Sequence, residues 1–188
     1  MSSGKTLRAL SAALLSAATL VAAQTTAAAA PTPTPTPSVR VATYDASGSA
    51  EFRSAVDRGA AIWNESVAAV QLRPAAAGQR ADIRVLADNG WPRAIPAGLG
   101  RGTVYIGRQA VDQGYDTVRI SSHELGHILG LPDRKPGPCS SLMSGSTAGV
   151  SCTNPYPNAA EKAEVEGDFG GRFAPRSADV AWNVPIRD

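Results

Sequence analysis

The chain has 188 residues, of which 43% are hydrophobic and 18% are charged, and its formal net charge is +2. This length suits one domain with a buried core and not two. The nearly neutral charge gives no electrostatic reason to expect nucleic acid or an acidic membrane surface as a partner, so we predict neither. We expect a monomer.

The N-terminus has the composition of a secretory signal peptide. Lys5 and Arg8 precede an apolar, alanine-rich run, which ends in the small residues Ala28, Ala29 and Ala30. The apolar run is too short for a membrane span. We therefore predict a signal peptide over residues 1–30, an extracellular protein and no membrane anchor.

The repeat "PTPTPTPS" at residues 31–38 predicts an extended tether, either a short propeptide or a linker. Beyond it, apolar periodicity predicts strands over 39–44, 81–88 and 102–107, and helices over 51–70, 116–129 and 158–166, with a loop between residues 88 and 102. Ser47 or Ser49 is the expected cap before the first helix. This order of elements predicts an α+β fold in which one long helix backs a small sheet.

Both histidines of the chain lie in the stretch "SSHELGHILGLPD". His123 and His127 are four residues apart, so a helix places them on one face, where both imidazoles can bind one Zn²⁺ ion. Glu124 lies beside them and can act as a general base toward water. The spacing predicts two zinc ligands and a catalytic carboxylate on one helical turn.

A catalytic zinc ion usually has a third protein ligand. Gly130 permits a left-handed turn at the end of the helix, so Asp133 can return to the metal and is the preferred third ligand. A glutamate of the last helix is the alternative. The candidates there are Glu161, Glu164 and Glu166.

An H-E-x-x-H pattern alone occurs by chance on ordinary helices. The glycine turn, the aspartate, the export signal and the absence of any other histidine favour the metal site over that explanation. The competing function is a secreted, non-catalytic metal-binding or inhibitor module, whose zinc would be structural.

"HELGHILGLPD" resembles the extended zinc motif of the metzincin peptidases in its aspartate-bearing form. Residues 137–166 are similar to the snapalysin family, the small secreted neutral proteases of Streptomyces. The resemblance implies a metzincin-like zincin fold with a twisted mixed sheet, a backing helix, an active-site helix and a short C-terminal subdomain with a Met-turn. It implies a catalytic domain over residues 39–166, with 167–188 as a C-terminal extension. It also implies a zinc endopeptidase that cleaves proteins or peptides and prefers aromatic residues at P1'.

Further roles follow from the same resemblance. Met143 matches the Met-turn methionine, and Cys139 and Cys152 match the family disulfide, as export and the presence of only two cysteines also suggest. A Ca²⁺ site is implied at Asp116 and Val118, with helix N-capping by Asp116 as the alternative.

Three expectations complete the sequence reading. The strand over residues 102–107 is expected at the sheet edge, where an extended substrate could pair with it. Tyr156 is a candidate for stabilising the oxyanion. Trp182 is expected either to dock on the domain or to have no role.

Overall fold

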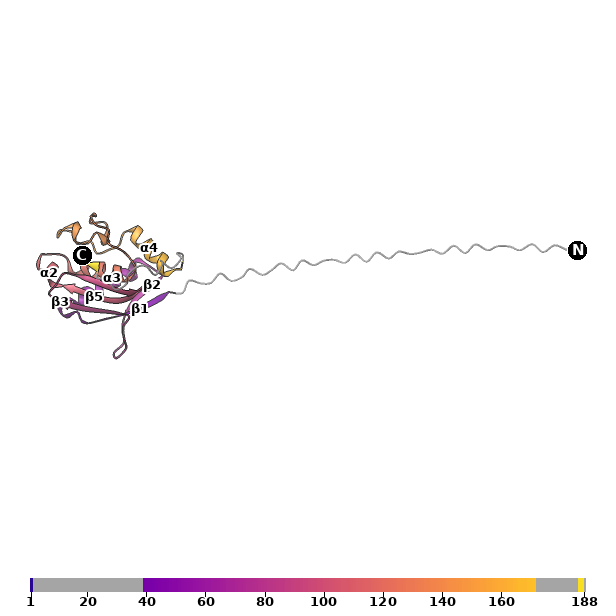
Figure 1. Ribbon diagram of the computed structural model, residues 1–188, viewed down its shortest axis with the longest axis horizontal. Helices are drawn as coiled ribbons and strands as arrows, with labels where there is room; N and C mark the ends of the chain where they lie inside the picture. The colour runs from indigo at the N-terminus through magenta and orange to yellow at the C-terminus, as the bar shows by residue number, and fades with distance from the viewer. Residues whose placement is uncertain (2–38, 172–185, 188) are drawn as a thin grey trace. The chain divides into compact units, whose positions relative to one another are not determined.

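The computed structural model describes Met1, residues 39–171 and residues 186–187 (Figure 1). The predicted signal peptide apart from Met1, the Pro/Thr tether and Trp182 lie outside these residues. Within the described part of the chain, none of the helices is long and apolar enough to span a membrane.

The strands form one mixed sheet in the order β2-β1-β3-β5-β4-β6. β2, β1, β3 and β5 run parallel to one another, whereas β4 runs antiparallel to β5 and to the two-residue strand β6. The strands are β1 (Arg40–Gly48), β2 (Val70–Pro74), β3 (Ile83–Asp88), β4 (Arg93–Gly98), β5 (Arg101–Gly107) and β6 (Ile186–Arg187).

The predicted edge position of residues 102–107 is wrong. β5 pairs with β3 on one side and with β4 on the other, so it lies inside the sheet. β4 follows β5 on that side, in a segment predicted as a loop because of its proline and glycine residues, and the two-residue strand β6 lies outside it. Pro96 is tolerated there because a strand near the sheet edge does not need every backbone N–H for pairing.

The predicted helix over residues 51–70 is shorter in the structure. A 3₁₀ turn (Ala50–Phe52) leads into α1 (Arg53–Ser66), and Val70 already begins β2. Ser49 precedes the turn, but its hydroxyl donates a hydrogen bond to the carbonyl of Ala46 at 2.7 Å and caps no helical N–H. The apolar face of α1 packs into the core as its period predicts.

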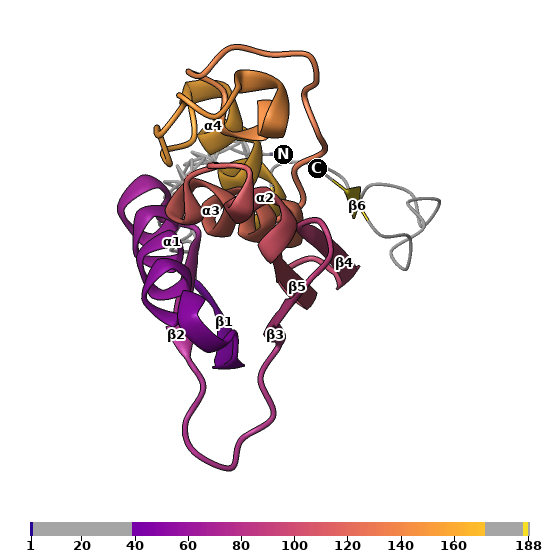
Figure 2. The same ribbon diagram turned by 90° about the vertical axis from the view of Figure 1, so that its left-hand side faces the viewer.

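α3 (Thr117–Ile128) lies at the centre of the folded part, and Figure 2 shows it between the sheet and α4 (Ala159–Phe169). Ten of its 12 residues are buried. α1 packs closely on it at Gly59, where an added Cβ would lie only 3.0 Å from the backbone nitrogen of Ser122. The indole N–H of Trp63 donates to the carbonyl of Ser122 at 2.8 Å, so a hydrogen bond also joins the two helices.

The C-terminal part contains a loop closed by a disulfide and then α4 (Ala159–Phe169). Asn158 and Glu161 form a capping box at the start of α4, and the helix continues three residues past its predicted end. The loop includes a 3₁₀ segment (Leu142–Ala148). The sequence reading missed the short helix α2 (Arg108–Asp112).

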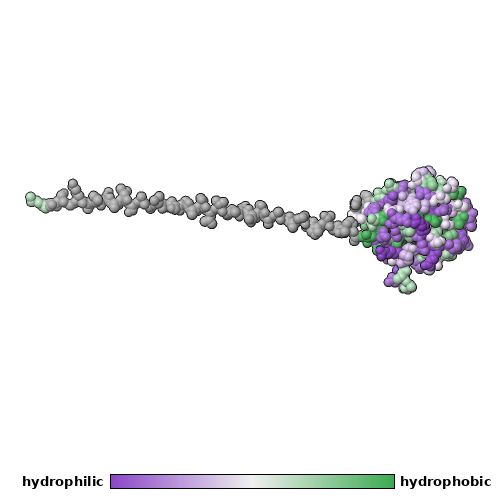
Figure 3. All heavy atoms as spheres, turned by 180° about the vertical axis from the view of Figure 1, so that it is seen from behind, coloured by the Kyte–Doolittle hydropathy of each residue, from purple (hydrophilic) through white to green (hydrophobic). Residues whose placement is uncertain are grey.

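The face drawn in Figure 3 mixes hydrophilic and hydrophobic residues over the folded part. The large apolar side chains are mostly interior, and one cluster joins α1, α3 and the sheet through Trp63, Ile106 and Leu125. The site described next is therefore built on the most buried element of the fold.

Candidate metal centre

The helix that carries the histidines has the predicted boundaries. Asp116 is its N-cap, since one carboxylate oxygen accepts a hydrogen bond from the backbone N–H of Arg119 at 2.8 Å, and Leu129 is its C-cap. Gly130 has a φ of 104°, which is the left-handed turn expected at that position. The chain reverses there, and Asp133 returns toward the helix.

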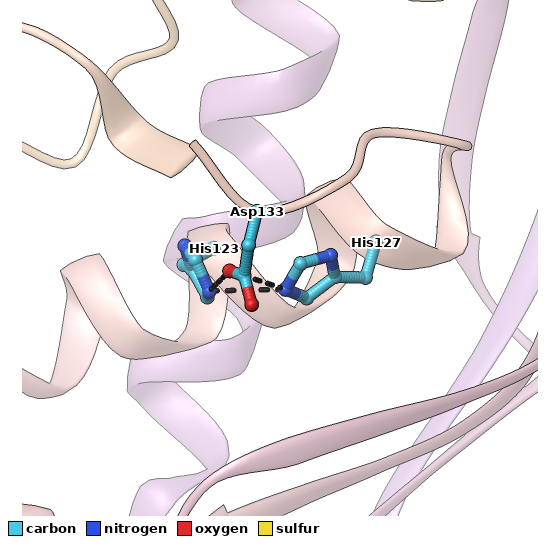
Figure 4. Close-up of side chains that lie close together, drawn as sticks. All are labelled: His123, His127 and Asp133. Atoms are coloured by element: carbon cyan, nitrogen blue, oxygen red, sulfur yellow. Dashed lines mark hydrogen bonds and ion pairs between the residues drawn. The ribbon is translucent and has the colours of Figure 1, made fainter. Parts of the chain in front are cut away.

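The structure brings His123, His127 and Asp133 together (Figure 4). The two Nε2 atoms are 3.0 Å apart, and Oδ1 of Asp133 lies 3.4 Å from each of them. Both imidazoles are 1% exposed, and the aspartate side chain is 26% exposed. Two nitrogens and one oxygen therefore converge on one point, and of the three side chains only that of Asp133 is partly exposed.

Hydrogen bonds at the outer side of each ring fix the tautomers. Nδ1 of His123 lies 3.0 Å from the carbonyl oxygen of Leu142, and Nδ1 of His127 lies 2.8 Å from that of Leu131. A carbonyl oxygen can only accept, so each Nδ1 carries the proton. Each neutral ring then directs the lone pair of its Nε2 into the site, as in metal-binding histidines.

In these tautomers the two Nε2 atoms and Oδ1 of Asp133 are all acceptors. They face one another, and no proton lies between the two nitrogens to join them by a hydrogen bond. Burial lowers the pKa of His127 and outweighs the opposing effect of Asp133, so protonation of this ring is disfavoured. Two ligands of a tetrahedral zinc ion, each about 2.0–2.1 Å from the metal, would lie about 3.3–3.4 Å apart. The observed separations are close to that value, so the donor set fits zinc.

Asp133 is the anionic member of the group. Burial acts to raise the pKa of its carboxyl, but the two neighbouring imidazoles outweigh burial and hold the pKa well below its ordinary value. Its second oxygen, Oδ2, lies 3.4 Å from Nζ of Lys135. The group therefore holds an ionised carboxylate with one oxygen toward the histidines and one toward a lysine.

Glu124 follows His123 on α3, and its side chain is fully buried. A carboxylate next to a metal ligand and shielded from bulk solvent is suited to proton transfer at that site. Its role as a general base stays a prediction.

The three rival glutamates have other partners. Glu164 accepts a hydrogen bond from Arg134, and Glu166 accepts from the backbone N–H groups of Ala68 and Ala69. Glu161 binds the backbone of Leu142 and Met143. None of these contacts points to the histidine pair, so the geometry favours Asp133 as the third ligand.

The disulfide loop lies against the histidine helix. Cys139 and Cys152 are bonded, as predicted, with their Cα atoms 5.5 Å apart. Met143 is fully buried within this loop, and a Cβ added to Gly126 would lie 2.9 Å from its sulfur. Met143 therefore packs directly against α3 at Gly126, which lies between the two histidines in the sequence. Its assignment to a Met-turn stays a prediction.

Two other expectations gain no support. The carboxylate of Asp116 is engaged in N-capping, and Val118 lies in the first turn of α3, so the calcium expectation rests on the resemblance alone. The hydroxyl of Tyr156 donates to Glu65 at 3.1 Å and accepts from Arg58 at 2.6 Å. Tyr156 is thus held against α1 and not among the metal-binding side chains.

Sequence reasoning did not name Arg119 and considered Glu161 only as a rival zinc ligand, whereas the structure buries both charges near the site, at 6% and 0% exposure. Both bind the segment that contains Leu142 and Met143. One signal was available for each: Arg119 lies one turn before His123 on the core-facing side of α3, and Glu161 stands three residues after a capping asparagine.

Comparison with known proteins agrees with the geometry. Residues 38–170 match the profile described as the Streptomyces extracellular neutral proteinase family.

Proteins named extracellular small neutral protease are similar as well. The relative from Streptomyces caespitosus is 47% identical over 125 residues, 65% of this chain and 92% of that protein. The relative from Streptomyces sp. strain C5 is 43% identical over 131 residues, and that from Streptomyces coelicolor 41% over 141 residues. These two matches cover 70% and 73% of this chain, but only 57% and 63% of the relatives. The matches confirm the family resemblance and the extracellular location.

Proposed function

Since the chain belongs to the Streptomyces extracellular neutral proteinase family, we propose that it is a zinc-dependent endopeptidase. The single observation that supports this most is the convergence of two Nε2 atoms and one carboxylate oxygen, with both Nδ1 protons directed outward. A structural zinc would be closed by four protein ligands. Both cysteines are in a disulfide, so no thiol remains to complete such a set.

His123 and His127 would hold the ion through Nε2, and Asp133 through Oδ1. The zinc, when bound, supplies a Lewis acid that polarises the scissile carbonyl and makes a water molecule acidic near neutral pH. Glu124 takes the proton of the attacking water and later passes it to the leaving amine. The carbonyls of Leu131 and Leu142 keep the two imidazoles in the required tautomer throughout.

The first test replaces Glu124 by glutamine, which keeps the shape of the side chain and removes its basicity. We expect casein hydrolysis to fall by about 10²–10⁴-fold, the usual contribution of a general base, while zinc stoichiometry stays unchanged. The matched control is Glu65→Gln, at an exposed carboxylate on α1 that pairs with Arg58. Wild-type hydrolysis by the Glu124→Gln variant would rule out the general-base role.

The second test concerns the metal. A chelator should abolish hydrolysis, and zinc should restore it. Retention of zinc by a protein that cleaves neither casein nor peptides would favour the alternative, a secreted metal-binding or inhibitor module.

We also propose the P1' preference for aromatic residues, on the family resemblance. A peptide series that differs only at P1', with Phe, Tyr, Leu and Ala, measures it as kcat/KM. The aromatic peptides are expected to be cleaved fastest, and equal rates across the series would contradict the preference.

A further inference from the structure

We infer that Arg119 and Glu161 act together as positioning residues for the metal ligands, by holding the backbone of Ser141–Met143 from its two sides. This inference rests on the proposed zinc site and adds two residues that act on it through the backbone of that segment. The name 141–143 clamp is used below for Arg119, Glu161 and the backbone of Ser141–Met143 together.

The first step is that one ligand depends on this segment. Nδ1 of His123 donates to the carbonyl of Leu142, which is 19 residues away in the chain and fully buried. A shift of that carbonyl would tilt the imidazole or break the hydrogen bond that keeps the proton on Nδ1. His127 differs, because its acceptor is the carbonyl of Leu131 in the adjoining turn.

The second step is that the other end of the segment leads to Asp133. The carbonyl of Met143 accepts a hydrogen bond from the backbone N–H of Arg134 at 2.7 Å. Arg134 follows Asp133 directly, so the segment fixes the backbone beside the third ligand. The positions of two proposed ligands, His123 and Asp133, thus both depend on the backbone of Ser141–Met143.

The third step is the cation on the carbonyl side. The guanidinium of Arg119 donates to the carbonyl of Ser141 at 2.9 Å, to that of Leu142 at 3.3 Å and to the hydroxyl of Ser144 at 3.0 Å. It also donates to the carbonyl of Asn154. Leu142 O therefore accepts from Arg119 and His123 together, which fixes its direction.

The fourth step is the anion on the amide side. One carboxylate oxygen of Glu161 accepts from the hydroxyl of Ser141 at 2.6 Å and the N–H of Met143 at 3.0 Å. The other accepts from the N–H of Leu142 at 3.1 Å and that of Asn158 at 2.7 Å. Four donors satisfy the two oxygens of this fully buried carboxylate.

Burying two charges is costly unless hydrogen bonds compensate each of them. Here Ser141, Leu142 and Met143 supply three of the four donors to Glu161 and two of the acceptors of Arg119, so both charges stay fully satisfied only while that segment keeps its position. A purely apolar packing would stabilise the loop without fixing the direction of a carbonyl. The arrangement therefore explains why charged residues, and not apolar ones, occupy these buried positions.

The test measures zinc affinity of the purified, oxidised protein by competition with a chelator. Arg119→Lys keeps the charge but loses the planar fork, and Glu161→Gln keeps the shape but presents N–H groups to donors. Each variant should weaken zinc binding by about 10–100-fold, as is typical for residues that orient metal ligands. The absorption spectrum of the Co²⁺-substituted protein should change, since it reports the geometry of the ligands.

Matched controls separate positioning from general stability. Glu166→Gln removes a carboxylate of the same helix that binds the N–H groups of Ala68 and Ala69, and Arg58→Lys alters an exposed arginine on α1. Both should leave zinc affinity and the Co²⁺ spectrum as in the wild type. Ser141→Ala, which deletes one hydrogen bond to Glu161 and keeps both charges, is the milder variant if the others do not fold, and should weaken zinc binding less.

The result that would overturn the inference is a wild-type zinc affinity and Co²⁺ spectrum in Arg119→Lys and Glu161→Gln, or in Ser141→Ala if these do not fold, even if the unfolding temperature falls. Failure of the proposed function is distinguishable from this, because the wild-type protein would then either bind no zinc in the same titration or bind zinc without cleaving casein. Imidazole ¹⁵N shifts of the zinc-free protein give a readout without metal. They should show loss of the Nδ1–H tautomer at His123 in the clamp variants and not in the controls.

Discussion

The three side chains of the site reach it in different ways, and this difference decides what the sequence could predict. His127 and Asp133 are set by the end of α3 and the turn at Gly130, which are local features. His123 depends on Leu142, which lies in another part of the chain. The local pattern was sufficient to predict that these three side chains come together, but not the contacts that orient the first of them.

The choice of third ligand gives a prediction at this scale. Asp133→Ala should lower zinc affinity strongly, because it removes the carboxylate whose Oδ1 lies 3.4 Å from both Nε2 atoms. Glu164→Gln should leave affinity unchanged, since Glu164 pairs with Arg134. Competition with a chelator measures both, and the reverse outcome would assign the third ligand to α4.

Among the secondary-structure elements, prediction succeeded where a signal was repeated along the chain. α3 has an N-cap, apolar periodicity and a terminating glycine, and its bounds were predicted almost to the residue. β4 was missed because Pro96 and Gly98 resemble loop residues, and only pairing with β5 reveals the strand. The position of β5 inside the sheet likewise depends on contacts distant in sequence, which periodicity does not report.

The N-cap of α3 can be tested against the calcium expectation. Asp116→Ala should lower the free energy of unfolding by about 1 kcal/mol, whereas Asp116→Asn should cost little, because asparagine is an equally good N-cap. Denaturant unfolding with and without Ca²⁺ measures both effects. Stabilisation of the wild type by Ca²⁺ that both variants lose would instead support a calcium site at Asp116.

For the molecule as a whole, stability depends on pH through the burial of His127. Burial lowers the pKa of His127 below the ordinary value of 6.5, so between the two values the unfolded chain binds more protons than the folded one. The contribution of this ring to stability is complete above pH 6.5. It is lost progressively as the pH falls from 6.5 to the lowered pKa.

We therefore expect the free energy of unfolding of the zinc-free protein to decrease as the pH falls from 7.5 to 5. Denaturant titrations across this range measure the decrease, which should be smaller in His127→Gln. A pH dependence unchanged by this substitution would show that other groups cause it.

The central place of α3 has a consequence for a protease that works outside the cell. The helix that carries the reactive groups is also the helix around which the interior is assembled. With the proposed zinc ion removed, a copy is expected to open more often and to offer its own peptide bonds to intact neighbours. Spent molecules would then be digested by active ones, so the secreted population would remove its own inactive members.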